Sequence, residues 1–208
     1  MKPPQVFKPK LLLCEGKDEV EFFSALLKHL NRSDVQIESV GGKHFFAPNI
    51  AALATDPKLS QVTDILIVRD ADFTQAGAGF ASTWQSVTDA LGRNGLPVPT
   101  AHATFVPGPP RVAAFIMPDG QSDGMLETLC AAAVQADPAT SCVVGYFTCL
   151  QLQTNFTHLA RNQDKAFTRA FLASRPEPDR KLGEAAQAGY WPWNSLAFAP
   201  LIGLLSQL

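Results

Sequence analysis

Three carboxylates follow two apolar segments, at points where the chain changes from apolar to polar residues. Glu15 comes directly after the run 11–14, and Asp70 and Asp72 follow the run 65–68. Ligands of open parallel sheets bind at the carboxyl ends of the strands, so these residues are the first candidates for a site. Asp70 and Asp72 are two residues apart, so both can face one side of an extended chain. Neighbouring strands lie about 4.8 Å apart, and Glu15 would join the pair if its strand lies beside theirs.

Carboxylates gathered in this way favour a bound cation. Close carboxylates repel one another and retain protons unless a positive charge neutralises them. Mg²⁺ suits one or two carboxylates together with waters and a phosphate, so Mg²⁺ (or Mn²⁺) is the expected cofactor. Glu19 lies four residues after Glu15 and could form a second metal position, with a solvated helix face as the alternative. For Asp72, capping of the turn toward Thr74 is the alternative.

Further acidic side chains lie close to these positions. Asp18 has the spacing of a capping box with Glu21 and is interpreted as a helix cap, with a place at the site as the alternative. Asp119 and Glu127 bracket the passage from a predicted strand to a helix, and either could add a carboxylate to the site.

Two lysines follow the first and second predicted strands. Lys17 and Lys43 could bind a phosphate together with backbone N–H groups at a helix start. Ordinary connections between strand and helix are the alternative interpretation.

The elements that must position these groups alternate between strand and helix. Apolar runs predict strands at 10–15, 35–40 and 64–70, and helical spacing predicts helices at 18–31, 45–54 and 80–91. Residues 102–106 and 112–117, around the turn 107–110, are expected to form a hairpin or a strand pair at one sheet edge. After residue 119 only helices are expected, at 124–135, 140–151, 156–173, 182–188 and 195–208. The pattern predicts an α/β fold with a mostly parallel sheet, an α/β core at 1–120 and a C-terminal helical extension at 121–208 packed on that core.

Composition excludes several classes of protein. The 208 residues include 17 Lys and Arg and 19 Asp and Glu, a formal charge of −2, which excludes a generally basic protein that coats nucleic acid. No stretch approaches the ~20 apolar residues of a membrane span, and no signal-peptide core is seen, so a cytoplasmic protein without a membrane partner is expected. The four cysteines lack C-x-x-C spacing and are expected to be free, buried thiols.

The ordered acidic motifs resemble those of the Toprim domain, which occurs in primases, topoisomerases and OLD-type nucleases. Glu15-Gly16-Lys17-Asp18 follows one predicted strand, and Asp70-Ala71-Asp72 follows a later one. Haloacid-dehalogenase-like phosphatases and response-regulator receivers place their acidic residues in a different order. The Toprim match covers about residues 8–120. The stretch 12–23 and the helical remainder resemble a small stand-alone Toprim-like family of unknown function, related to the OLD-type nucleases.

This resemblance implies roles for particular residues. In Toprim domains the glutamate at the position of Glu15 is a metal ligand or general acid/base, and the pair at Asp70 and Asp72 holds Mg²⁺. In OLD-type members an acidic residue at the position of Glu19 also binds metal. A later lysine lies by the site, and Lys165 is the best candidate in sequence order.

Two functions follow from the resemblance. One is a Toprim-like, divalent-metal-binding protein with Mg²⁺-dependent, nuclease-like phosphoryl transfer on nucleic acid. In it Glu15 and Lys165 are catalytic, and Glu15, Glu19, Asp70 and Asp72 bind the metal. The alternative is a non-catalytic binding or regulatory module that acts with a separate ATPase partner, since this chain has no G-x-x-x-x-G-K-[ST] loop.

Overall fold

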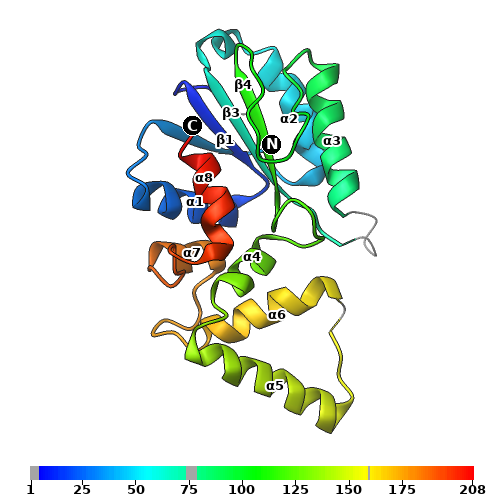
Figure 1. Cartoon of the computed structure of the whole chain (residues 1–208), viewed down its shortest axis with the longest axis vertical. Helices are drawn as coiled ribbons and strands as arrows, with labels where there is room; N and C mark the ends of the chain where they lie inside the picture. The colour runs from blue at the N-terminus through cyan, green and yellow to red at the C-terminus, as the bar shows by residue number, and fades with distance from the viewer. Residues whose placement is uncertain (1–4, 74–78, 159) are drawn as a thin grey trace.

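The computed structural model describes residues 5–73, 79–158 and 160–208, and a four-stranded parallel sheet lies at its centre (Figure 1). The strands are adjacent in the order β2-β1-β3-β4, and every neighbouring pair is parallel. They comprise β1 (Lys10–Cys14), β2 (Val35–Ser39), β3 (Asp64–Asp70) and β4 (Arg111–Met117). The predicted α/β class is confirmed, and β1 and β3 are neighbours, as the site prediction requires.

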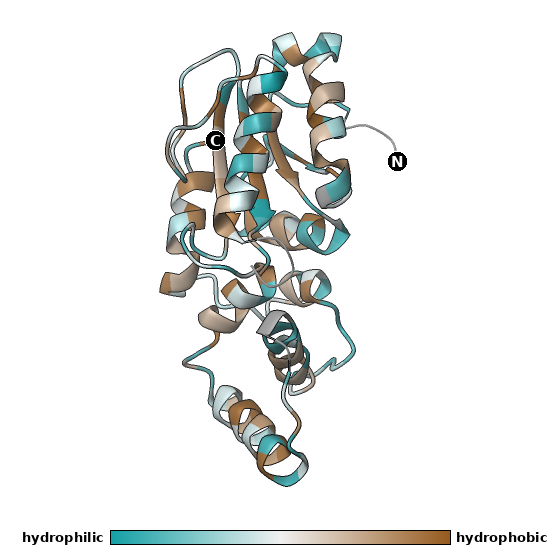
Figure 2. Ribbon diagram, turned by 90° about the vertical axis from the view of Figure 1, so that its right-hand side faces the viewer, coloured by the Kyte–Doolittle hydropathy of each residue, from teal (hydrophilic) through white to brown (hydrophobic). Residues whose placement is uncertain are grey.

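Helices cover both faces of the sheet, which explains the continuous apolar runs in β1 and β3. Leu12 and Leu66 face one buried cluster, to which α1, α4, α6, α7 and α8 contribute. Leu13 and Ile67 face the opposite cluster, with α2 and α3. Figure 2 shows hydrophobic residues along the strands between these layers. The helices are α1 (Lys17–His29), α2 (Lys43–Ala54), α3 (Phe80–Arg93), α4 (Leu126–Ala133), α5 (Pro138–Thr154), α6 (Ala160–Leu172), α7 (Leu182–Gln187) and α8 (Ala199–Leu205), with 3-10 turns at Pro57–Gln61 and Leu196–Phe198.

The C-terminal helices share a core with the sheet. The Phe22 ring of α1 lies 5.2 Å from the Trp193 ring and 5.9 Å from the Phe198 ring, centroid to centroid. In contrast, α5 lies at the far end of the molecule (Figures 1 and 2), and the buried residues of this helix are Thr140 and Val143. No helix in the described part of the chain combines the length and apolar character that a membrane span requires.

The one-sided packing of α5 corrects the prediction for the cysteines. All four are free, but only Cys14 and Cys130 are buried. Cys142 and Cys149 are exposed, because both lie on the part of α5 that is not buried against the rest of the chain.

The predicted hairpin is wrong. Residues 102–106 form no strand and contribute only an isolated bridge between Val106 and Val112, and β4 pairs in parallel with β3. The backbone of Ala103 has a φ of 53°, which interrupts an extended chain. The Nε2 atom of His102 accepts the Ile116 N–H at 2.9 Å. The segment before β4 therefore covers the sheet edge with a side chain and scattered backbone bonds instead of a paired strand.

Candidate functional site

A cavity of about 380 Å³ opens at the carboxyl end of β3. The end of β3, the start of α1 and the start of α4 form its floor and walls, and α6 and the residues before α7 complete it. It is lined by Gly16, Lys17, Asp18, Glu19, Asp70, Leu126, Glu127, Lys165, Lys181 and Leu182. The topology thus places polar groups from distant parts of the chain at the sheet edge where parallel α/β proteins bind ligands.

Three partly buried carboxylates from separate elements face this cavity. Glu19 comes from the first turn of α1, Asp70 from the last residue of β3 and Glu127 from the first turn of α4. The Asp70 Oδ1 atom accepts the backbone N–H of Leu126 at 2.9 Å, which fixes the start of α4 against the end of β3. The Lys165 Nζ atom lies 3.7 Å from Glu127 Oε1.

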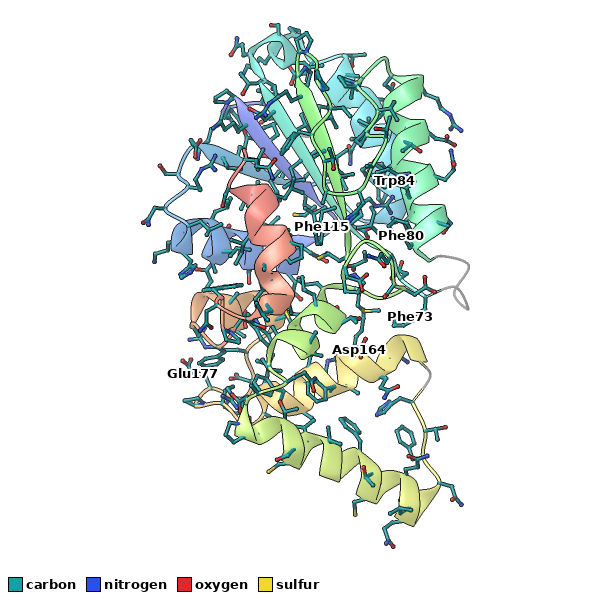
Figure 3. The ribbon with its side chains drawn as sticks, in the orientation of Figure 1. Phe73, Phe80, Trp84, Phe115, Asp164 and Glu177 are labelled. Atoms are coloured by element: carbon teal, nitrogen blue, oxygen red, sulfur yellow. The ribbon has the colours of Figure 1, made fainter. Side chains whose placement is uncertain are left out.

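Hydrogen bonds between α4 and α6 hold Lys165 near the carboxylates. Thr128 donates its hydroxyl to Asp164 Oδ2 at 2.5 Å, and Figure 3 shows Asp164 between these two helices. The Thr168 hydroxyl lies 3.4 Å from the Glu127 carbonyl oxygen. These contacts determine which face of α6 is turned to the cavity.

Burial and nearby negative charge raise the pKa of two of these carboxylates, Asp70 and Glu19. Burial raises the pKa of Asp70 well above its ordinary value, and the negative charges of Glu15 and Glu19 add to the effect. Burial also raises the pKa of Glu19, with further contributions from Glu15 and Glu127. Because these shifts come from burial and negative neighbours, a cation in the cavity would favour the ionised forms of Asp70 and Glu19.

Glu15 lies close to this group but is turned away from the cavity. Its Oε1 atom accepts Arg69 Nε–H at 2.8 Å, and the two side chains are 15% and 5% exposed. The Arg69 guanidinium lies 4.5 Å from the Phe46 ring centroid, on the side of the sheet that α2 covers. Because Cys14 faces the opposite cluster, alternation along the chain directs Glu15 toward Arg69. Glu15 is not among the described residues that line the cavity.

Asp72 does not continue the extended strand, so the expectation that Asp70 and Asp72 face one side of an extended chain does not apply. β3 ends at Asp70, and Asp72 has a φ of 58°. The Asp72 N–H donates to the Gly124 carbonyl at 2.7 Å, and the Gly124 N–H donates to the Asp72 carbonyl at 2.8 Å. This bridge to the segment before α4 turns the backbone, and Asp72 too is absent from the described cavity lining.

The prediction that Asp18 caps α1 is wrong. The helix begins one residue earlier than predicted, with Gly16 as N-cap and no side-chain capping bond. Asp18 is consequently in the first turn, where it lines the cavity together with Lys17.

Asp119 belongs to a turn instead of the cavity. Its carboxylate accepts backbone N–H groups of Gln121 and Ser122 at 2.9 and 2.7 Å and the Ser122 hydroxyl at 2.8 Å. Burial opposes ionisation of Asp119, but these hydrogen bonds outweigh it and lower the pKa. Of the two predicted phosphate-binding lysines, Lys17 lines the cavity, whereas the side chain of Lys43 lies outside the described part of the structure.

The chemistry of the donors fits a hard cation that keeps part of its water shell. In the described part of the chain no three His, Cys, Asp or Glu side chains converge into a ready coordination group. Structural zinc requires such a closed set of four ligands. Mg²⁺ needs only one or two carboxylates, with waters and phosphate oxygens completing six positions, and Glu19, Asp70 and Glu127 offer that chemistry.

Sequence reasoning missed Lys181 as a residue of the site. It lies between the loop after α6 and the start of α7 and reaches the wall of the cavity. No motif surrounds it, and only the packing of α7 against α1 brings it there.

Fold and site together define an α/β protein with a carboxylate-lined cavity at the carboxyl edge of a parallel sheet. The chain belongs to the family described as "Protein of unknown function (DUF3226)", whose profile matches residues 9–208. No curated protein has a matching sequence.

Among the solved structures that match this chain are two with different degrees of similarity. Hypothetical protein PH0156 from Pyrococcus horikoshii OT3 has 16% sequence identity and a TM-score of 0.63, over 97% of this chain and 95% of that one, which shows a shared fold. The C-terminal region of the OLD protein from Xanthomonas campestris pv. campestris aligns over 97% of this chain and 98% of that one, with 13% identity and a TM-score of 0.41.

Proposed function

We propose that this protein is Toprim-like, binds Mg²⁺ or Mn²⁺ in the cavity at the end of β3, and acts on phosphodiester bonds of nucleic acid. The observation that carries the proposal is the gathering of Glu19, Asp70 and Glu127 around one cavity that also exposes Lys165. The order of the motifs supports the Toprim relationship, with Glu15 after β1, Asp70 at the end of the adjacent β3 and Asp72 two residues later.

Each of these residues has a distinct part in the proposed chemistry. One or two of the carboxylates Glu19, Asp70 and Glu127 would bind the cation directly and the rest through its waters, and the Leu126 N–H keeps the Asp70 carboxylate in place. A divalent ion bound there supplies charge stabilisation for a phosphoryl oxygen and a water of lowered pKa. Lys165, whose side chain is 49% exposed, can leave Glu127 to stabilise the negative charge on a substrate phosphate. Glu15 is paired with Arg69, so it could act as a general base only for a group that approaches this ion pair.

That pairing also favours a second candidate function. Because Arg69 neutralises Glu15, the residue expected to act as general base is engaged elsewhere. A non-catalytic module that binds metal and nucleotide or nucleic acid, and acts with a separate ATPase, needs only the cavity carboxylates and lysines.

Thermal unfolding during titration with Mn²⁺ tests the metal site. At a hundredfold excess over the dissociation constant, ligation stabilises the folded state by about 2.7 kcal/mol, or roughly 5–10 °C in Tm for a chain of this length. Asp70→Asn should weaken Mn²⁺ binding at least about tenfold. Asp89→Asn, a change in an exposed carboxylate of α3, should retain the wild-type response. Equal stabilisation of wild type and Asp70→Asn would exclude this site.

Cleavage assays then separate the two functions. Labelled single-stranded and duplex DNA and RNA are incubated with wild type and Asp70→Asn in Mn²⁺. Cleavage by wild type that Asp70→Asn abolishes supports the nuclease. Metal-dependent stabilisation without cleavage supports the binding module.

A further inference from the structure

A second cavity adjoins the carboxylate cavity. It has a volume of about 450 Å³ and lies between α6 and the residues that lead into α7. The two cavities share five lining residues, Asp18, Glu127, Lys165, Lys181 and Leu182, so they form one continuous depression.

Basic side chains predominate in the outer part of this depression. Lys165 and Arg169 are four residues apart on α6 and therefore lie on one face of the helix. Arg180 and Lys181 face them from the segment before α7. The carboxylates Asp18 and Glu127 stand at the boundary with the first cavity, which leaves Asp179 as the additional acidic residue in this lining.

Two of these cations are free to bind an anion. Arg180 is paired with Glu177 at 2.6 Å; Figure 3 labels Glu177 at this side of the molecule. Among the described residues, no carboxylate lies within ion-pair distance of Arg169 or Lys181. Both side chains belong to exposed residues. On a chain with a formal charge of −2, this is a local positive surface directly beside an acidic cavity.

We propose that the two cavities form one path for an unpaired nucleic-acid strand, an inference that rests on the proposed function. A phosphodiester would occupy the carboxylate cavity, and a neighbouring phosphate of the same strand would lie on Arg169 and Lys181. Sequence-independent binding of nucleic acid comes from such Lys and Arg contacts to phosphates. Each cavity has the size of a small-ligand pocket, which fits a nucleotide of one strand and not a duplex, whose major groove alone is about 12 Å wide.

Fluorescence anisotropy of the full chain with a 5′-labelled single-stranded DNA 12-mer in EDTA tests the path without requiring a metal. The double variant Arg169→Glu/Lys181→Glu should bind at least tenfold more weakly than wild type at low salt. The negative slope of log affinity against log salt should become shallower by about 1.4, because each of the two lost phosphate contacts on a single strand contributes about 0.7. Arg93→Glu, a change in an exposed arginine of α3 that lines neither cavity, should bind as wild type. The Tm of all three proteins should agree, because the substituted residues are exposed.

Several outcomes would overturn the path. If the double variant binds with wild-type affinity, Arg169 and Lys181 do not contribute to binding of the strand. If the protein binds the 12-mer and its duplex with equal affinity, the path does not select an unpaired strand. Displacement of the 12-mer by dTMP at an equal phosphate concentration would show that a single nucleotide suffices. The metal proposal is judged separately, by the Mn²⁺ response of Asp70→Asn, so the two can fail independently.

Discussion

At the scale of single residues, neighbouring carboxylates differ in how their charge is compensated. Glu15 has a buried cation, Arg69, at 2.8 Å. Asp70 has the N–H of Leu126 at the start of α4, a favourable but partial charge. Glu19 and Glu127 surround Asp70 with further negative charge. A cation on the side of the sheet that α1 and α4 cover would therefore stabilise the ionised form of Asp70.

The raised pKa of Asp70 predicts a pH dependence of stability. In EDTA the folded state keeps the Asp70 proton at pH values where the unfolded chain, with a pKa near 3.9, has lost it. Ionisation of Asp70 thus lowers stability as pH rises above about 4. Asp70→Asn removes this loss, so its free energy of unfolding relative to wild type should increase from pH 4.5 to 7.5 in urea titrations.

Asp119→Asn is the matched control, with the opposite sign. The pKa of Asp119 is lowered in the folded state, so its ionisation stabilises the protein above the unfolded pKa, and this stabilisation is lost as pH falls. Relative to wild type, Asp119→Asn should lose stability as pH rises through about 4, and the difference should be nearly constant at higher pH, where Asp119 is ionised in both states. A pH-independent difference between Asp70→Asn and wild type would contradict the explanation.

At the scale of elements, contacts beyond the sheet decide where the helices of the extension lie. Asp137 is the N-cap of α5 and accepts the Ala139 N–H at 2.8 Å. The same carboxylate accepts two hydrogen bonds from Arg175, each 3.1 Å long. The Arg175 guanidinium also lies 4.3 Å from the centroid of the Phe171 ring of α6. One acidic residue therefore joins the start of α5 to the segment after α6.

We expect Asp137→Ala to lower the free energy of unfolding by about 1–2 kcal/mol, with about 1 kcal/mol from the cap and the rest from the ion pair. Asp137→Asn preserves the cap and should lose only the ion-pair part. Asp89→Ala, which removes an exposed pair with Arg93, should change stability by less than about 0.5 kcal/mol. Urea denaturation measures all three, and equal losses for Asp137→Ala and Asp89→Ala would show that the Asp137 contacts are unimportant.

At the scale of the whole molecule, the α/β core and the helical extension share one buried cluster. Phe22 of α1 is fully buried and contacts Trp193 and Phe198, and Trp191 is 2% exposed in the same cluster. Separation of the two parts would expose this apolar surface to water, at a cost of about 25 cal/mol per Å². The extension therefore contributes to the stability of the sheet as well as to the cavity walls.

A single unfolding transition is the expected consequence. Tryptophan fluorescence, which reports on Trp84 in α3 as well as on Trp191 and Trp193, and far-UV circular dichroism should give coincident urea curves. Phe22→Ala should lower the free energy of unfolding obtained from both curves by the same amount, about 3–5 kcal/mol. Phe7→Ala, at a phenylalanine that is 70% exposed, should leave them nearly unchanged. Two separated transitions would show that residues 1–120 and 121–208 unfold independently.

Consecutive residues by themselves determined the order of strands and helices and the position of Asp70 at a strand end. Apolar periodicity is a local property, and it located all four strands of the sheet. It also predicted a strand at 102–106 that does not form, because His102 and Ala103 depend on contacts with β4. Tertiary structure alone decided which charges share the cavity. It added Lys181, placed Glu127 and not Asp119 in the cavity lining, and turned Glu15 toward Arg69, because such placements depend on packing between residues far apart along the chain.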